Sequence, residues 1–398
     1  MNPSKLIGLI PNDPEIKKIK SKYKRISTFV NTARCRAFIK DKQAGESIDS
    51  ALAAVNELHK KDIGKRALFY AGCAESYSIL PGIERKKSSS AVKDAIKELT
   101  GAKTSSRIPD HDKIITSIAK TGVNLDDIKI VNSARELCNK IQHGEDIVPS
   151  LCVVAKCYAR LGDAEKAFEL VKSAQNDLLK RKFDNKLMGH LMGDIAITLV
   201  KIAGITRKFI YLRKAKDEIE MLSDLLRERR GVCEDKKSDE MIVSFNERIT
   251  YIAGVRVIIN LIPPGTMRTD LADRFMKVNE KFWKRPVQYF NRLSGGDVLW
   301  SSHLHRALLD TANVFYCLEE NKTSGNILKS PELNLSYSRE NLPLLIEMAM
   351  LWENMDAKHS GKIINEFYNK IKEADVEERA AMLSEILMLI HCDKINKN

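Results

Sequence analysis

Apolar residues recur with helical spacing along most of the chain, while strand-like alternation of apolar and polar residues is almost absent. The pattern is clearest in residues 148–177, where a turn at Gly162-Asp163 separates two predicted helices. One face of these helices carries Leu151, Val154, Ala155, Tyr158, Ala167, Leu170, Val171 and Ala174. Proline and glycine are sparse inside the periodic stretches, so the sequence predicts an all-α protein.

Small residues mark the predicted contact between these two helices. Ala155, Ala167 and Ala174 allow antiparallel helices to approach closely, and Tyr158 fills the space between them. One helix pair cannot cover its own apolar faces. We therefore expect neighbouring pairs to stack on it.

Two weaker copies of the pattern flank this pair. In the upstream copy, Ile118 corresponds to Tyr158 and Gly122 corresponds to Gly162. Each residue of the upstream copy lies 40 positions before its counterpart (118 to 158 and 122 to 162). The downstream copy covers residues 191–222. The period of about 40 is longer than the 34 residues of ordinary tetratricopeptide arrays, and longer helices account for the excess.

This arrangement resembles the tetratricopeptide repeat. The resemblance rests on Val154, Ala155, Tyr158, Gly162, Asp163, Ala167 and Ala174. Leu151 stands where the family often has tryptophan, the closing proline is missing, and only this unit, about a tenth of the chain, fits well. The resemblance implies an α–α superhelix of stacked antiparallel helix pairs, a TPR-like solenoid with a concave binding groove.

The pattern changes along the chain and predicts three regions. They are an N-terminal helical region (1–108), a TPR-like repeat region (109–233) and a C-terminal helical region (234–398). Residues 321–338 form the longest irregular stretch and are expected to be a linker or an exposed loop. About three helices follow, and Pro343 is expected in the first turn of the first of them.

Composition narrows the class of partner and compartment. The chain has 398 residues and a net charge of +13, which favours acidic partners, nucleic acid included. Its eight cysteines are scattered with no Cys-x-x-Cys pair, which indicates free thiols in a reducing cytoplasm. The N-terminal apolar run is too short for a signal peptide. No window is expected to be long and apolar enough to cross a bilayer, so we expect no membrane span. Nothing in the sequence indicates an oligomeric state.

No motif nominates a catalytic reaction. Glycine-rich phosphate loops and the Gly-x-Ser-x-Gly elbow are absent from the sequence. His303 and His305 point apart on a helix and would not chelate one metal, whereas His190 and Asp194 can meet as an ordinary i,i+4 pair. We predict no cofactor, no metal and no enzyme. A deep pocket converging on His303, His305 and Asp310 would instead favour an enzyme with a dispersed site.

Basic residues are the most suggestive feature for binding. The first hypothesis is a scaffold whose groove, within residues 110–230, docks a protein or peptide with acidic side chains. Its candidate residues are Lys201, Arg207, Lys208, Arg213 and Lys214. The alternative is an RNA-binding protein that uses Lys17, Lys18, Lys20, Lys22, Lys24 and Arg25.

An aromatic segment also interleaves with cations, at residues 282–290. Trp283 and Phe290 within it fit a buried helical core better than a surface on which bases stack. We therefore do not count this segment among the candidate binding residues.

Overall fold

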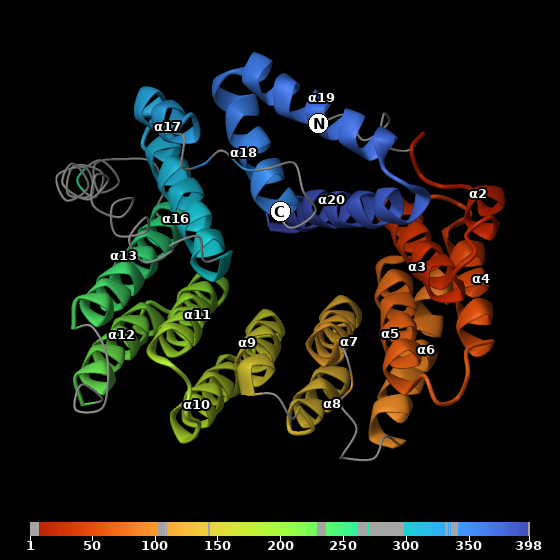
Figure 1. Cartoon of the computed structure of the whole chain (residues 1–398), viewed down its shortest axis with the longest axis horizontal. Helices are drawn as coiled ribbons and strands as arrows, with labels where there is room; N and C mark the ends of the chain where they lie inside the picture. The colour runs from red at the N-terminus through yellow and green to blue at the C-terminus, as the bar shows by residue number, and fades with distance from the viewer. Residues whose placement is uncertain are drawn as a thin grey trace. The chain divides into compact units, whose positions relative to one another are not determined.

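The fold is all-α, as the periodicity predicts. The computed structural model describes residues 8–101, 108, 110–141, 144–228, 236–261, 270, 298–330, 333, 335 and 341–396. Over these ranges it has seventeen helices and no strand (Figure 1). The helices pack in adjacent pairs.

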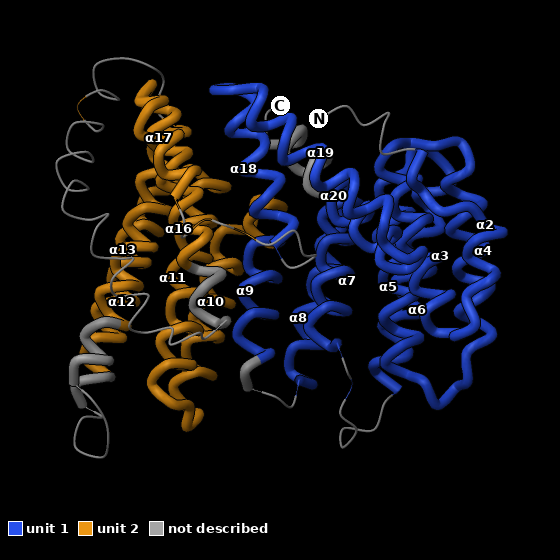
Figure 2. Tube along the Cα trace, turned by 45° about the horizontal axis from the view of Figure 1, so that its top comes forward, with its two compact units in different colours: residues 1–157, 336–398 blue, residues 158–335 orange. Residues whose placement is uncertain are grey.

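Two compact units divide the chain (Figure 2). Unit 1 joins residues 1–157 to residues 336–398, and unit 2 covers residues 158–335. The three regions expected from the sequence, with limits near residues 108 and 233, were defined by their pattern and not as compact units. That division stays a prediction.

Unit 1 brings the two ends of the sequence together. Its helices are α2 (Asp13–Lys17), α3 (Lys22–Phe38), α4 (Ala44–Asn56), α5 (Ile63–Ile79), α6 (Gly82–Gly101), α7 (His111–Leu125), α8 (Ile128–Cys138), most of α9 (Gly144–Arg160), α18 (Leu342–Met355), α19 (Ala357–Glu373) and α20 (Val376–Asn396). Successive helices pair as α3–α4, α5–α6, α7–α8 and α18–α19, while α20 packs against α3. An ion pair of 2.9 Å between Arg379 and Glu15 supports this contact between distant segments.

Unit 2 is built around one apolar helix. Its helices are α10 (Ala164–Lys180), α11 (Asn185–Thr206), α12 (Ile210–Glu228), α13 (Lys236–Leu261), α16 (Val298–Cys317) and α17 (Asn321–Leu328). α11 packs against α10, α12 and α13, and α13 packs in turn against α16. Most of α11 is therefore buried among its neighbours.

An 18-residue window of α11 is long and apolar enough, by length and composition alone, to cross a membrane. The expectation that no such window exists was wrong. However, 67% of the window is buried inside the structure, as a core helix of a globular unit would be. The absence of a membrane span stays a prediction.

Local signals at the predicted helix pair agree with the sequence. Tyr158 is completely buried, and Gly162 has a φ of 84°, a left-handed value that favours glycine. Asp163 then caps α10, because its side chain accepts a hydrogen bond of 3.0 Å from the Lys166 amide. In the upstream copy, a Cβ at Gly122 would lie 2.7 Å from Val131, so the glycine permits the close approach of α7 and α8.

Part of the irregular stretch expected at 321–338 is helical. Residues 321–328 form α17, whose Ile327 and Leu328 are buried. The Ser324 hydroxyl donates a hydrogen bond of 2.8 Å to the Ala312 carbonyl of α16. Packing against α16 therefore overrides the weak helix propensity of a segment rich in small and polar residues. The prediction for Pro343 is confirmed, since it lies in the first turn of α18.

Candidate functional site

The clearest candidate site is an apolar groove in unit 2, between α11, α12 and α13. The groove has a volume of about 600 Å³, which is in the range of protein pockets that bind ligands or partner side chains. Its α13 wall is a stripe at helical spacing made of Ser244, Glu247, Arg248, Tyr251, Gly254, Val255 and Ile258. α12 contributes Leu212, Lys216, Ile219 and Glu220, and α11 contributes Val200.

The sequence of α13 explains why one of its faces stays open. Phe245, Ile249, Ile252 and Ile259 are buried in the unit. Tyr251, by contrast, is 41% exposed, on the face that lines the groove. A helix that is apolar nearly all round leaves an apolar face toward solvent when its neighbours cover only part of it.

The groove has an apolar end and a charged end. Leu212, near the start of α12, is the nearest side chain to Gly254, near the end of α13, so the two helices run antiparallel. Val255 and Ile258 lie at this apolar end. At the other end Lys216 pairs with Glu220 at 3.2 Å, close to Glu247 and Arg248 on α13. This ion pair is largely exposed and contributes little to stability.

Thr250 is the unusual polar group of the groove. Its side chain lines the cavity and is only 8% exposed, yet its hydroxyl has no hydrogen-bond partner. An unpaired buried hydroxyl costs about 1–3 kcal/mol. The hydroxyl oxygen itself has almost no accessible surface, so it is part of the groove's support rather than of its binding surface.

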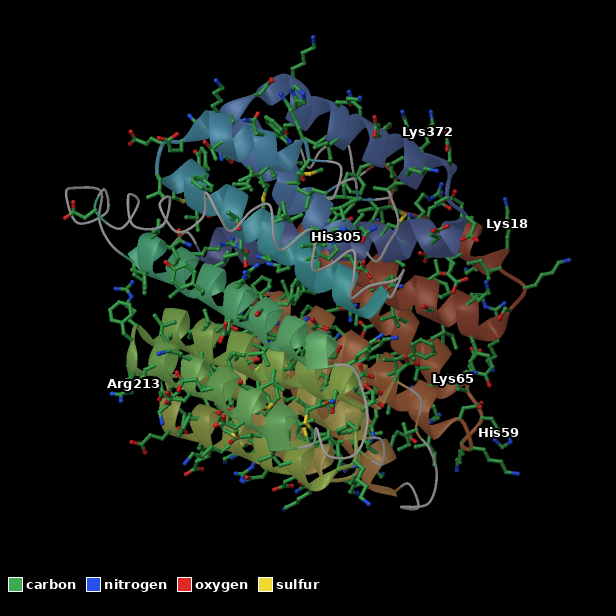
Figure 3. All side chains as sticks on the ribbon, turned by 60° about the vertical axis from the view of Figure 1, so that its left-hand side comes forward. Lys18, His59, Lys65, Arg213, His305 and Lys372 are labelled. Atoms are coloured by element: carbon green, nitrogen blue, oxygen red, sulfur yellow. The ribbon has the colours of Figure 1, made fainter. Side chains whose placement is uncertain are left out.

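The cations predicted to bind a partner lie on the same helices but do not line the groove. The end of α11 carries Lys201, the following turn carries Arg207 and Lys208, and the start of α12 carries Arg213 and Lys214. Arg213 points outward at the periphery (Figure 3). Lys214 is engaged within the unit, since its ammonium lies 3.7 Å from the centre of the Phe168 ring.

The N-terminal cations of the RNA alternative are divided between contacts and solvent. Lys22 donates to the Glu57 carbonyl at 2.7 Å, Lys24 pairs with Glu377 at 2.9 Å, and Arg25 donates to the Ile19 carbonyl at 3.4 Å. The other three, Lys17, Lys18 and Lys20, are exposed. Lys18 projects from the surface in Figure 3.

A cavity of about 450 Å³ beside these cations has mixed charge. Lys18 and Lys24 line it together with Glu15, Asp375 and Glu377. The acidic residues weaken the positive potential that phosphate binding needs.

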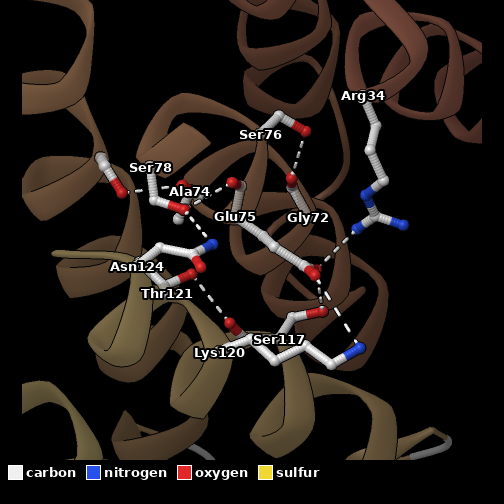
Figure 4. A network of polar contacts seen from close by, with 11 residues as sticks. Arg34, Gly72, Ala74, Glu75, Ser76, Ser78, Ser117, Lys120, Thr121 and Asn124 are labelled. Carbon is white, nitrogen blue, oxygen red and sulfur yellow. Dashed lines mark hydrogen bonds and ion pairs between the residues drawn. The ribbon is translucent and has the colours of Figure 1, made fainter. Parts of the chain in front are cut away.

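The most extensive polar network that the structure describes is structural, and it lies in unit 1 (Figure 4). Glu75 on α5 is buried, 3.1 Å from Arg34 of α3, 2.9 Å from the Ser117 hydroxyl of α7 and 4.0 Å from the Lys120 ammonium. Burial alone would raise the pKa of Glu75, but Arg34, Lys120 and the Ser117 hydrogen bond outweigh it, and the pKa lies below its usual value. The network therefore joins three helices through one charged carboxylate.

Gly72 makes room for this network. A Cβ at Gly72 would lie 2.8 Å from Val30 and 3.3 Å from the Arg34 guanidinium. No sequence signal beyond a glutamate inside the apolar run of α5 points to the pairing, because Arg34 and Glu75 are 41 residues apart.

The residues of the enzyme alternative do not converge on the groove. Asp310 is buried between Arg256 and Arg306, whose guanidinium lies 3.0 Å from the carboxylate. Burial alone would raise the pKa of Asp310, but the two cations lower it. Neither Asp310 nor His305 lines the groove, and the His303 side chain lies outside the described residues.

Other candidate chemistry is likewise explained by packing. His190 and Asp194 meet at 3.8 Å, as their spacing predicts. Among the described side chains, no group of three or more His, Cys, Asp or Glu is arranged to hold a metal ion. Burial raises the pKa of Cys35, Cys73 and Cys138 to about 12, which leaves these thiols unreactive. The segment 282–290, with Trp283 and Phe290, lies outside the described residues.

No family model and no curated protein matches the chain.

Proposed function

We propose that the chain is a cytoplasmic, helical-repeat binding scaffold, with TPR-like stacked helix pairs, that docks an amphipathic helix of a partner protein. The observation that carries the proposal is the stripe of α13 that faces α12, which is polar from Ser244 to Arg248 and apolar from Tyr251 to Ile258. From Ser244 to Ile258 it extends about 21 Å, since a helix rises 1.5 Å per residue. A partner helix of about four turns would match that length.

The chemistry of the groove defines the partner further. Leu212, Val255 and Ile258 favour apolar side chains at spacings of three and four residues on the partner helix. Lys216, Glu220, Glu247 and Arg248 favour a polar, charge-bearing segment at the opposite end.

The five cations predicted from the sequence have a different part in this proposal. Because Lys201, Arg207, Lys208, Arg213 and Lys214 lie beside the groove rather than in it, they steer an acidic partner instead of fixing its position. Steering of this kind raises the association rate more than the affinity, and salt weakens it. Neutralising these cations should therefore slow association and leave dissociation nearly unchanged.

A library of helical peptides displayed on phage and selected against the full chain tests the proposal. We expect the selected peptides to share apolar residues at positions i, i+3 or i+4, and i+7. Their binding should fall at least tenfold on Gly254→Leu, which fills the groove. The variant is sterically permitted, because the nearest atom to a Cβ at Gly254 is a Leu212 methyl at 3.8 Å.

Gly361→Leu is the matched control. It places the same side chain on a helical glycine of α19, where a Cβ meets nothing within 4 Å. Selected peptides that bind Gly254→Leu as well as they bind the native chain would refute the groove as the docking site. A preference for RNA, with affinity that falls steeply with salt and is lost on neutralising Lys17, Lys18 and Lys20, would favour the alternative function.

A further inference from the structure

The turn between α11 and α12 exposes an unusual group of large apolar side chains. Ile205 is 37% exposed, Phe209 52% and Ile210 53%. In the described part of the chain, only Ile83, Leu179 and Tyr251 are otherwise exposed to this degree among large apolar residues. Half of that set thus falls within six consecutive residues. Exposed apolar groups that cluster in this way mark an interaction surface.

The same turn is strongly basic. Between Asp194 and Asp217 the chain has no acidic residue and six cations, namely Lys201, Arg207, Lys208, Arg213, Lys214 and Lys216. Arg207, Lys208 and Arg213 are exposed, and none of them forms an ion pair with a described residue. Glu165 acts on this end of α12, since it adds to the effect of burial in raising the pKa of Tyr211, and Glu218 acts on Lys214. The six cations outnumber these carboxylates. The local charge therefore remains positive.

Contacts below the turn hold it in place. The Tyr211 hydroxyl donates a hydrogen bond of 3.1 Å to the Ala164 carbonyl of α10. The centres of the Tyr211 and Phe168 rings lie 5.9 Å apart. The Lys214 ammonium lies over the Phe168 ring, 3.7 Å from its centre. Because the start of α12 is fixed in this way, Phe209 and Ile210 are presented outward at little cost in ordering on binding.

We propose that the α11–α12 turn docks on the surface of an anionic lipid bilayer. Phe209 and Ile210 would enter the boundary between headgroups and acyl chains, while Arg207, Lys208 and Arg213 would contact anionic headgroups. Outward-pointing apolar side chains ringed by cations suit a flat, deformable, negatively charged surface. A peptide partner would need a recess, and the groove of unit 2 includes none of these five residues.

Vesicle flotation with the full chain tests this surface. We expect binding to vesicles with 30% phosphatidylserine in phosphatidylcholine, little binding to pure phosphatidylcholine, and weaker binding at high salt. The double substitution Phe209→Ser with Ile210→Ser should reduce binding at least tenfold. Neutralising Arg207, Lys208 and Arg213 to glutamine should reduce it about a hundredfold, at about fivefold per cation.

Two matched controls separate this surface from general properties of the chain. Ile83→Ser removes an apolar side chain that is 73% exposed elsewhere, and it should leave binding unchanged. Neutralising Lys17, Lys18 and Lys20 removes the same charge from another surface and should lower binding far less than the change at the turn. An equal loss from both charge triplets would show that net charge alone drives binding, and this would overturn the proposal.

Two further outcomes would also overturn it. One is the absence of native binding to phosphatidylserine vesicles. The other is binding of an acidic peptide such as polyglutamate without binding of any vesicle, where the Phe209 and Ile210 substitutions abolish the binding of the peptide. The groove proposal stands or falls separately, because Gly254→Leu alters neither the exposed apolar residues nor the cations of the turn.

Discussion

Replacing Thr250 by valine should make the protein more stable. The hydroxyl of Thr250 is buried without a hydrogen-bond partner, whereas valine has the same shape and a similar helix propensity. Removing a buried hydroxyl that costs about 1–3 kcal/mol should raise the free energy of unfolding by about 1 kcal/mol. Urea unfolding followed by circular dichroism measures this change. The slope of the free energy of unfolding against urea concentration should be the same in the variant and the native chain.

Thr311→Val provides the opposite case in the same unit. Its hydroxyl is also buried, but it donates a hydrogen bond of 2.8 Å to the Ala307 carbonyl. We expect Thr311→Val to lower the free energy of unfolding by about 0.5–1.5 kcal/mol. If Thr250→Val destabilises the chain as much as Thr311→Val does, the hydroxyl is already paired and the reasoning is wrong.

Three further predictions concern two buried carboxyl groups and the closely packed Gly72. Glu75→Gln should lower the free energy of unfolding by about 3 kcal/mol at pH 7, because it leaves the partly buried Arg34 guanidinium without its carboxylate. In the native chain the stability from Glu75 should be lost as pH falls through its lowered pKa. Gly72→Ala should cost about 1–3 kcal/mol, since its methyl would press on α3, while Gly361→Ala should stabilise the chain by about 0.5–1 kcal/mol. Burial raises the pKa of Glu218 from 4.5 to about 7, so ionising it in the fold costs at most about 3 kcal/mol, and stability should decline as pH rises from 4.5 to 7. Glu218→Gln should remove that decline in urea unfolding measured at several pH values, and an unchanged pH profile would contradict the assignment.

Local signals in the sequence were enough for the helices and for one helix pair. Hydrophobic period predicts where helices form, and the glycine at 162 with the aspartate at 163 marks a helix stop and a helix start. These signals act over a few residues, so they survive whatever the rest of the chain does. The prediction failed at residues 321–328, where the helix depends on contacts with α16.

The candidate site was harder to predict, because it depends on which faces remain uncovered. The stripe on α13 is visible in the sequence, but so is a second apolar face on the same helix, and the period does not say which face neighbours cover. Charge suggested the cations around Arg207 and Lys208, yet the groove is lined by residues up to fifty positions later in the chain. Nothing in the sequence around Thr250 indicates a buried, unpaired hydroxyl. This state arises only in the fold, where burial excludes water and no neighbouring group accepts or donates a hydrogen bond.

Both proposed surfaces depend on α12, and its geometry makes them compatible. The first turn of the helix carries Ile210 outward, and the groove extends along the same helix to Glu220. Along this helix the groove begins at Leu212, about 3 Å from Ile210, and its charged end at Glu220 lies about 15 Å away. A helix docked in the groove would therefore lie beside a bilayer contacted by the turn, without needing the same side chains. Lys216, between the two, belongs to the groove through its pair with Glu220. Charge substitutions at Arg207 and Lys208 therefore leave the groove lining intact, and they should change the rate at which a groove partner associates but not the rate at which it dissociates.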